Sequence, residues 1–333
     1  MSASINRQVL LAEKPTGKLT SSHFKLVDGK IPEPKDGEVL LRTRLISLDA
    51  ANRAWMQGAT YRAAVEANTV MAGGSISEVV SSKAPGFAAG DLIFADTGWQ
   101  DYAALPAKHL IKVPKIEPMS YLLSVYGIAG LTAYFGLLNV GQPKEGNTVV
   151  VSAAAGSVGS IVGQIAKIKG CRVVGIAGGA EKCKWLTSEL GFDAAVDYKN
   201  TALFKELKAA APNGIDVYFD NVGGDIFEAC LFQMNNRGRI ACCGAVSQYD
   251  GAPSATGPRG VPGLIVVKRL TVQGFIVTDF NDQRDKALAD LQSWVASGKL
   301  KVQEDIVNGI ENTPQALIGL LNGENRGKRM VRV

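Results

Sequence analysis

The stretch Val149–Lys169 constrains the fold more than any other part of the sequence. It begins with an apolar, β-branched run, continues with small residues over 153–159, and ends in an amphipathic helical pattern. This order predicts a strand, a tight turn and a helix. A helix N-terminus offers free N–H groups and a partial positive charge to a pyrophosphate, and small residues let backbone and phosphate approach closely. The stretch therefore predicts a loop that binds a nicotinamide or flavin dinucleotide.

The loop departs from the G-x-G-x-x-G pattern at one position. Ala154 stands where the first glycine is expected in the run Ala154, Ala155, Gly156, Ser157, Val158, Gly159. On its own, such a run is also compatible with a tight strand-to-helix turn that binds no ligand. The sequence that follows the loop favours the dinucleotide site.

Length and composition limit the classes of protein to consider. The 333 residues favour two domains over one core. The net charge is +5 without a run of like charges, so we expect no nucleic-acid partner. No apolar run reaches the roughly 18 residues of a membrane span, and no signal peptide is recognisable, so we expect no membrane partner either. The five cysteines are odd in number and all lie in the second half. Together with the lack of a signal peptide and of a long apolar run, this favours a reduced, cytoplasmic location.

Strand and helix patterns alternate from about Gly146 to Gly298. This alternation predicts parallel pairing in a doubly wound α/β sheet. The expected strands are 148–152, 172–177, 194–197, 215–220, 238–243 and 270–277, and the expected helices are 158–169, 180–190, 203–211, 225–235 and 282–297.

The N-terminal part has a different pattern, which predicts a β-rich, Greek-key or partly barrelled domain. Short strand candidates are separated by Gly, Pro and Asp turns; they are 8–11, 24–27, 38–46, 74–80, 92–94 and 100–104. Two late strands, 301–306 and 328–333, flank a helix with Thr313 as its expected N-cap and Pro314 at N1. We expect these strands to return to the first domain. The β-rich substrate domain is then 1–126 with 300–333, and the inserted dinucleotide-binding domain is 127–299.

A cleft is expected between the two domains. The segment Tyr249–Gly263, rich in Pro, Gly, Ser and Ala, is expected to form a long mobile loop over it. Asn221 follows the expected strand 215–220 and precedes two glycines. Ligands bind at such carboxyl strand ends in open α/β sheets. A turn asparagine that only satisfies backbone groups is the alternative for Asn221.

The end of the second expected strand indicates which dinucleotide binds. NAD-binding proteins usually carry Asp or Glu there, about 20 residues after the glycine loop. Here Gly178 and Gly179 occupy the strand end and Lys182 follows, which suits a 2′-phosphate. We therefore expect NADPH, with Glu181 as a partner of the helix dipole. A solvated surface lysine is the alternative for Lys182.

Taken together, these motifs resemble the zinc-independent medium-chain dehydrogenase/reductases. The resemblance is to the double-bond reductase branch, which includes prostaglandin reductases (leukotriene 12-hydroxydehydrogenases), plant alkenal reductases and NADPH-dependent curcumin reductases. It covers nearly the whole chain, and its motifs are specific only collectively. The segments that carry it are 153–159, 163–167, 169–175, 181–182, 190–193, 220–224 and 274–277, together with 97–102 and 319–325.

The resemblance implies a Rossmann domain inserted into a GroES-like catalytic domain, in a cytosolic and commonly dimeric enzyme. It implies NADPH as hydride donor and an α,β-unsaturated ketone or aldehyde as acceptor. By position, it implies that Lys182 and Tyr198 hold the 2′-phosphate, that Asn221 contacts the nicotinamide ribose, and that Tyr249 lies near the substrate carbonyl. The remaining residues implied to line the cofactor are Cys243, Gly244, Phe275, Ile276, Val277 and Asn325.

One departure from the branch concerns the substrate pocket. Relatives often carry an aromatic residue at the position of Ala51, within Asp49–Arg53. Asn52 lies in the same segment, and Trp55 or Tyr61 could replace the missing ring. A smaller wall could admit bulkier or differently shaped enones, so the substrate preference of the branch is not carried over.

A catalytic or structural zinc site is not expected. Residues 1–170 contain no cysteine, and the two histidines, His23 and His109, stand outside any Cys/His/Glu cluster. The same lack of a suitably placed histidine argues against a serine hydrolase triad.

The mechanism we expect is hydride transfer from NADPH to the β-carbon of an enone. The enolate oxygen would be stabilised by a cofactor ribose hydroxyl and by Tyr249, because hydrogen bonds must replace a metal. Tyr249 or water would then protonate the α-carbon. A loop tyrosine that only packs over the pocket is the alternative for Tyr249. Three other functions stay open: a quinone reductase of the same fold, a metal-free alcohol dehydrogenase, and an NADPH-binding protein without turnover.

Overall fold

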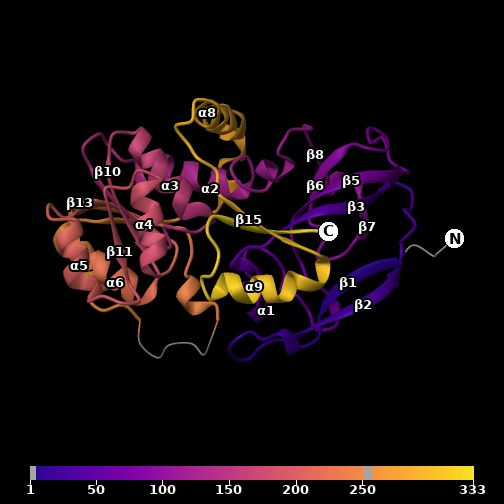
Figure 1. The fold of residues 1–333 in the computed structure, drawn as a ribbon, viewed down its shortest axis with the longest axis horizontal. Helices are drawn as coiled ribbons and strands as arrows, with labels where there is room; N and C mark the ends of the chain where they lie inside the picture. The colour runs from indigo at the N-terminus through magenta and orange to yellow at the C-terminus, as the bar shows by residue number, and fades with distance from the viewer. Residues whose placement is uncertain (1–4, 251–256) are drawn as a thin grey trace.

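Two halves of the molecule lie side by side, as Figure 1 shows. The structure is a computed structural model that describes residues 5–250 and 257–333. The central part of the chain, coloured magenta to orange, forms one half, and the indigo N-terminal part forms the other. The yellow C-terminal elements cross between them.

The central half contains a six-stranded parallel sheet with strand order β11-β10-β9-β12-β13-β14. This is the order of a doubly wound Rossmann sheet, and it confirms the expected fold class. The order reverses between β9 and β12, where such sheets bind their ligands. The strands are β9 (Thr148–Val151), β10 (Arg172–Ala177), β11 (Ala194–Asp197), β12 (Ile215–Asp220), β13 (Met234–Cys242) and β14 (Thr271–Gly274).

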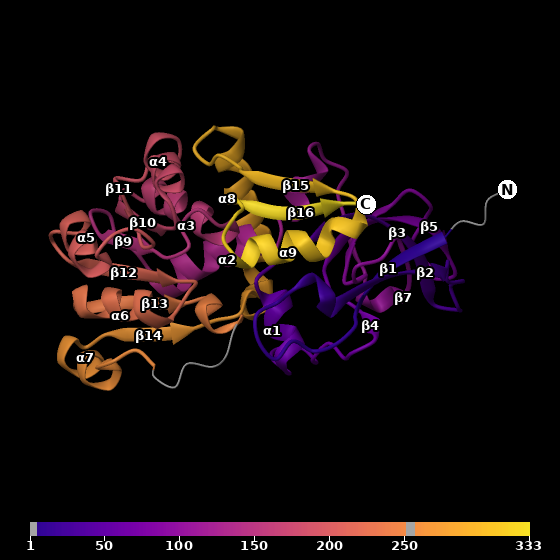
Figure 2. The ribbon, with the colours of Figure 1, turned by 60° about the horizontal axis from the view of Figure 1, so that its bottom comes forward.

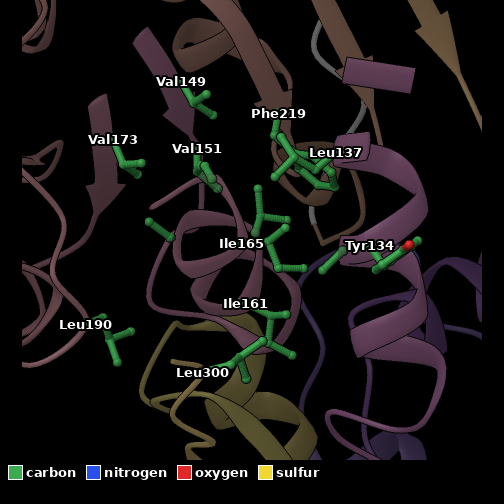
Figure 3. Close-up of a cluster of buried hydrophobic side chains, with 14 of the residues drawn as sticks. Tyr134, Leu137, Val149, Val151, Ile161, Ile165, Val173, Leu190, Phe219 and Leu300 are labelled. Carbon is green, nitrogen blue, oxygen red and sulfur yellow. The ribbon is translucent and has the colours of Figure 1, made fainter. Parts of the chain in front are cut away.

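Helices cover both faces of this sheet. Val149 and Val151 face one hydrophobic cluster and Val150 faces the other, and all three are fully buried. A strand buried on both faces has an unbroken apolar sequence, which explains the valine run. Figure 3 shows Val149 and Val151 above Ile161 and Ile165. Helices α2 (Ile128–Phe135), α3 (Ser157–Ile168), α4 (Ala180–Ser188) and α8 (Arg284–Ala296) contribute to the first cluster, and α5 (Leu203–Ala210), α6 (Gly224–Gln233) and α7 (Val261–Lys268) to the second.

The other half is β-rich, with sheet orders β15-β16-β3-β5-β6-β8 and β2-β1-β4, and with β7 paired to β3. Strand β16 pairs with β3 and β15, so the C-terminal strands return to the N-terminal sheet as expected (Figure 2). The exact boundaries, 1–126 with 300–333 and 127–299, stay a prediction. The strands are β1 (Ile5–Leu11), β2 (Phe24–Lys30), β3 (Glu38–Ser47), β4 (Thr69–Val70), β5 (Ser75–Ser82), β6 (Leu92–Ala95), β7 (Tyr102–Pro106), β8 (Ile111–Val113), β15 (Glu304–Asn308) and β16 (Lys328–Arg332).

Several elements differ from the sequence-based expectation. Helix α1 (Ala51–Gln57) was not predicted, and 261–263 begin α7 rather than ending a loop, because the apolar face of α7 packs on the sheet. The part of that loop at 251–256 lies outside the described residues. Helix α9 (Thr313–Leu321) has Asn312 as its N-cap instead of Thr313, whose hydroxyl donates to the Ile310 carbonyl. Gly136–Gly141 is a short π-helix. Short 3₁₀ helices are Ser21–His23, Ala107–His109, Met119–Leu122, Val246–Gln248, Val277–Gln283 and Ile310–Asn312.

The two halves are joined directly beside the predicted dinucleotide loop. The Gly327 N–H donates to the Ala155 carbonyl at 2.9 Å. The Gln164 side chain on α3 exchanges two hydrogen bonds with the backbone of Lys301, at 2.7 and 3.0 Å. The segment that precedes β16 is thereby held against the loop and α3, which fixes one wall of the cleft.

Candidate active site

A cavity of about 590 Å³ lies between the two halves, at the carboxyl ends of β9, β10, β11 and β12. A cavity at this edge of the sheet includes the point where the strand order reverses. Nine of the residues proposed from the sequence line it: Ala155, Gly156, Ser157, Val158, Gly159, Lys182, Tyr198, Asn221 and Asn325.

The small-residue loop turns sharply into α3. Ala153 adopts a φ of +46°, and Gly156 is the N-cap of the helix. A Cβ on Gly159 would lie 2.4 Å from the Ala153 carbonyl oxygen, so only glycine fits there. The Ser157 hydroxyl is buried and has no hydrogen-bond partner among the described residues. An unpaired buried hydroxyl beside a helix N-terminus fits a phosphate ligand.

Cations gather where β10 and β11 end. Lys182, Lys199 and Arg329 all line the cavity, and the Lys182 ammonium donates to the Gly323 carbonyl at 2.6 Å. Burial, followed by the charges of Lys199, Arg326 and Arg329, lowers the pKa of Lys182. A bound anion reduces the electrostatic repulsion between these positive groups. This end of the cavity therefore fits a phosphate group.

The strand end itself leaves room for these side chains. A Cβ on Gly178 would lie 2.9 Å from the Lys199 side chain and 3.1 Å from the Tyr198 ring. The Asp197 carboxylate accepts the N–H groups of Gly179 and Lys199. The Asp197 carboxylate is therefore already occupied by backbone N–H groups. Glu181 is exposed in the first turn of α4. The arrangement fits a 2′-phosphate better than a free ribose hydroxyl.

Asn221 lies at the reversal of the strand order. Its side-chain N–H group donates to the Ser152 carbonyl at 2.8 Å, and its backbone N–H donates to the Ser152 hydroxyl at 2.9 Å. The buried Asp220 carboxylate accepts the Ser152 hydroxyl and the backbone N–H groups of Val222 and Gly223. This network ties the ends of β9 and β12 together and fixes the floor of the cavity.

Tyr249 spans the border between the two halves. Its hydroxyl accepts the backbone N–H of Ala245 at 3.1 Å, and its carbonyl accepts the side-chain N–H of Gln57 on α1 at 3.0 Å. Val246, Ser247 and Asp250, on either side of it in sequence, line the cavity.

The other residues proposed for the cofactor do not line this cavity. Ala154 is fully buried, and Gly179 is the N-cap of α4. Burial raises the pKa of Cys243 to about 12, with the charge of Asp220 adding to the effect, so its thiol stays neutral. Phe275 packs edge-on against Phe219. Gly244 follows Cys243 in the chain, Ile276 is partly exposed, and Val277 begins a 3₁₀ turn.

The proposed substrate residues sit on or near α1. Ala51 packs against a hydrophobic cluster, and the Asn52 side chain is committed to the backbone of Asp49 and Ala72. Trp55 is buried and Tyr61 is exposed, with their rings edge-to-face at 6.3 Å.

Some residues that line the cavity were not predicted from the sequence. Lys199 follows Tyr198 at a strand end, so its charge could have been noticed. Asp49 and Arg329 both line the cavity only because β16 returns to β3. No local sequence pattern predicts this return. The Lys328 ammonium, buried beside β3, pairs with the Asp49 carboxylate. Burial would raise the pKa of Asp49, but Lys328 and the Ser47 hydroxyl together hold it below its ordinary value.

Among the described residues, no three or more His, Cys, Asp or Glu side chains are grouped as a metal would need. Within the same part of the chain, no helix has the length and apolar character needed to cross a membrane. A dinucleotide-binding oxidoreductase is the class that the sheet, the loop and the cation-lined cavity define.

Comparisons with known proteins identify the family. Residues 7–113 match the family model described as the N-terminal domain of oxidoreductase, and residues 157–293 match the one described as zinc-binding dehydrogenase. The chain is 43% identical to the NADPH-dependent curcumin reductase of Escherichia coli, over 98% of this chain and 97% of the relative. It is 45% identical to prostaglandin reductase 1 of Bos taurus, over 95% of each.

Solved structures agree with these matches. CurA from Vibrio vulnificus in complex with NADPH has a TM-score of 0.94 and 43% identity, covering 98% of this chain and 99% of that one. An Escherichia coli quinone oxidoreductase shares the fold, with a TM-score of 0.77 at 21% identity, covering 98% of this chain and all of that one. The chain therefore belongs to the medium-chain dehydrogenase/reductases, in their zinc-independent double-bond reductase branch.

Proposed function

We propose that this protein uses NADPH to reduce the carbon–carbon double bond of α,β-unsaturated ketones and aldehydes. One observation carries the proposal: a single cavity extends from Lys182 and Tyr198 at one end to Val246 and Asp250, which flank Tyr249, at the other. A cation-lined end for a 2′-phosphate and a tyrosine near the far end are what such a reaction needs. The likeness to curcumin, prostaglandin and 2-alkenal reductases supports the same NADPH-dependent reductase type.

Residues on several segments of the chain would hold the cofactor. The N-terminus of α3, with the Ser157 hydroxyl, would bind the pyrophosphate. Lys182, Tyr198 and Lys199 would bind the 2′-phosphate. Asn221 and Asn325 would contact other parts of the cofactor. The bound cofactor supplies the hydride that is delivered to the β-carbon of the substrate.

The role of Tyr249 would be to stabilise negative charge on the substrate oxygen. A hydrogen-bond donor placed where charge develops is worth more in a site shielded from water. The Ala245 N–H already occupies an acceptor position of the Tyr249 hydroxyl, which leaves the hydroxyl proton free to point toward a substrate oxygen. A ribose hydroxyl of the cofactor would be the second donor, and Tyr249 or water would protonate the α-carbon.

Ala51, Trp55, Tyr61 and Tyr249 would border the substrate, and Asn52 would support them from behind through its hydrogen bonds to Asp49 and Ala72. The small side chain of Ala51 leaves space where many relatives have a ring. The exposed Tyr61 ring, packed on Trp55, would form the outer edge of the pocket. A bulkier or differently shaped enone would suit this wall.

We further propose a cytoplasmic homodimer. All five cysteines are free, as in a reducing compartment. Every residue of the edge strand β14 is exposed, and Val266 and Val267 on the neighbouring α7 are 74% and 67% exposed. An open strand edge beside apolar side chains is suited to pairing with a second copy. Sedimentation of the purified protein tests whether it is a dimer.

The function is tested by NADPH oxidation with four acceptors: an alkenal, a linear enone, a bulky diarylheptanoid-type dienone and a quinone, with NADH in parallel. We expect turnover of the enones with a preference for NADPH. Turnover of the quinone alone would assign the protein to quinone reduction. Tight NADPH binding without oxidation of any acceptor would make it a binding protein.

A further inference from the structure

The border between the two halves contains a buried ion pair that the proposed chemistry does not use. Arg53 of α1 donates from Nε to the Asp250 carboxylate at 3.0 Å, and its side chain is 1% exposed. Asp250 follows Tyr249 directly and lines the cavity. Figure 2 shows α1 on the side of the β-rich half that faces the central half. The ion pair therefore connects the two halves next to Tyr249.

Two further contacts hold this short segment, and a third holds Arg53 itself. The Leu19 N–H donates to the same Asp250 oxygen at 2.7 Å, and Arg53 Nη2 donates to the Gly17 carbonyl at 2.7 Å. Gln57, one turn after Arg53 on α1, donates to the Tyr249 carbonyl at 3.0 Å. The tyrosine hydroxyl meanwhile accepts from Ala245 in the other half. Tyr249 is thus held at its carbonyl by α1 of the β-rich half, and at its N–H and hydroxyl by Val246 and Ala245 of the central half.

Stability alone does not account for the arginine. Arg53 Nη1 is buried and has no hydrogen-bond partner among the described residues. Burying a guanidinium costs much of what its ion pair returns, and an unsatisfied N–H adds to the cost. An apolar side chain of similar size would fill the site at a smaller cost in folding free energy. A fixed position for the segment that carries Tyr249 explains the arginine better.

We propose that Arg53 is a positioning residue for double-bond reduction, acting through Asp250 to hold the Tyr249 hydroxyl at the substrate carbonyl. The proposal rests on the proposed function. A side chain that moves by about 1 Å can cost on the order of 100-fold in rate, because the reacting groups lose their alignment. Arg53 is expected to affect the chemical step and to leave the distant 2′-phosphate site untouched.

The test is a double-mutant cycle on kcat with Arg53→Met, Tyr249→Phe and the combined variant, using the best enone and saturating NADPH. Arg53→Met is expected to lower kcat about 10-fold or more, with the Kd of NADPH, measured by fluorescence, changed less than about twofold. In the Arg53→Met background, Tyr249→Phe should cost much less than in the wild type, because residues that act as a unit are not additive. Arg53→Lys should restore part of kcat.

Two further variants keep the test decisive. Gln57→Leu removes only the exposed hydrogen bond to the Tyr249 carbonyl, so it should fold and lower kcat in the same direction. Arg7→Met breaks another Arg–Asp pair, to Asp101 at 2.9 Å, away from the cavity, and should leave kcat unchanged. Additive effects of Arg53→Met and Tyr249→Phe, or equal losses of kcat in Arg53→Met and Arg7→Met, would overturn the proposal. A wild-type protein that reduces no enone would instead refute the proposed function.

Discussion

The Lys182 ammonium and the Gly323 carbonyl oxygen lie 2.6 Å apart. This hydrogen bond joins α4 of the central half to the segment between α9 and β16. It holds the lysine at the cavity wall, where burial and then the neighbouring cations lower its pKa. We propose that this contact holds the Lys182 ammonium in place for the 2′-phosphate of NADPH before the cofactor binds.

Replacing Lys182 by alanine is expected to remove most of the preference for NADPH. A hydrogen bond to a charged group contributes about 1.5–3 kcal/mol, so the ratio of kcat/KM for NADPH over NADH should fall about 10- to 100-fold. Lys184→Ala is the matched control, because Lys184 lies exposed on the same helix and does not line the cavity. Equal ratios in wild type and Lys182→Ala would remove Lys182 from the phosphate site.

The affinity for NADPH should depend on pH through Lys182. Burial and neighbouring cations lower its pKa in the free protein, and a bound phosphate would raise it again. Protons are therefore taken up on binding in the pH range between these two values. Affinity should be constant below the free-state pKa and fall as the pH rises through it, starting at a lower pH than for an ordinary lysine. Titrations of NADPH and NADH across alkaline pH measure this, and parallel curves would contradict it.

Replacing Tyr249 by phenylalanine should lower kcat and leave the Kd of NADPH nearly unchanged. Loss of one donor to developing charge, partly replaced by water, is expected to cost about 10- to 100-fold. Steady-state kinetics with the best enone and a fluorescence titration of NADPH separate the two effects. Unchanged turnover would remove Tyr249 from the proposed mechanism.

Replacing Gly159 by alanine should destabilise the protein by about 1–3 kcal/mol, since the new methyl group would overlap the Ala153 carbonyl oxygen. Gly263→Ala on α7 is the control, because its Cβ meets no atom within 4 Å and alanine favours a helix by about 1 kcal/mol. Urea unfolding followed by circular dichroism measures both. A loss of stability in Gly263→Ala but not in Gly159→Ala would contradict the described packing of the loop.

Much of the fold was predictable because its signals are local. Local sequence features predict the structure of their own segment. They include the valine run of β9, the small residues before α3 and the glycines that end helices. The alternation of strands and helices then leaves few topologies. Helix α1 was missed because Ala51–Gln57 has no strong cap and its apolar side chains are packed by distant strands.

The site was predictable only where it follows a strand end. Lys182, Tyr198 and Asn221 each stand just after a parallel strand, so the topology places them at one edge. Asp49, Arg53 and Arg329 reach the border only through the return of the C-terminal strands and the packing of α1 on residues 17–19 and 249–250. Contacts across more than a hundred residues leave no pattern in the sequence.

The central claim concerns where the hydride goes, and the most direct measurement is isotope transfer. The protein is incubated with an enone and NADPH that carries deuterium at the transferable C4 position, and the product is analysed by NMR. The account predicts a saturated ketone with deuterium on the β-carbon and a solvent-derived proton on the α-carbon. Deuterium on a carbinol carbon, with the double bond intact, would show carbonyl reduction and contradict the account.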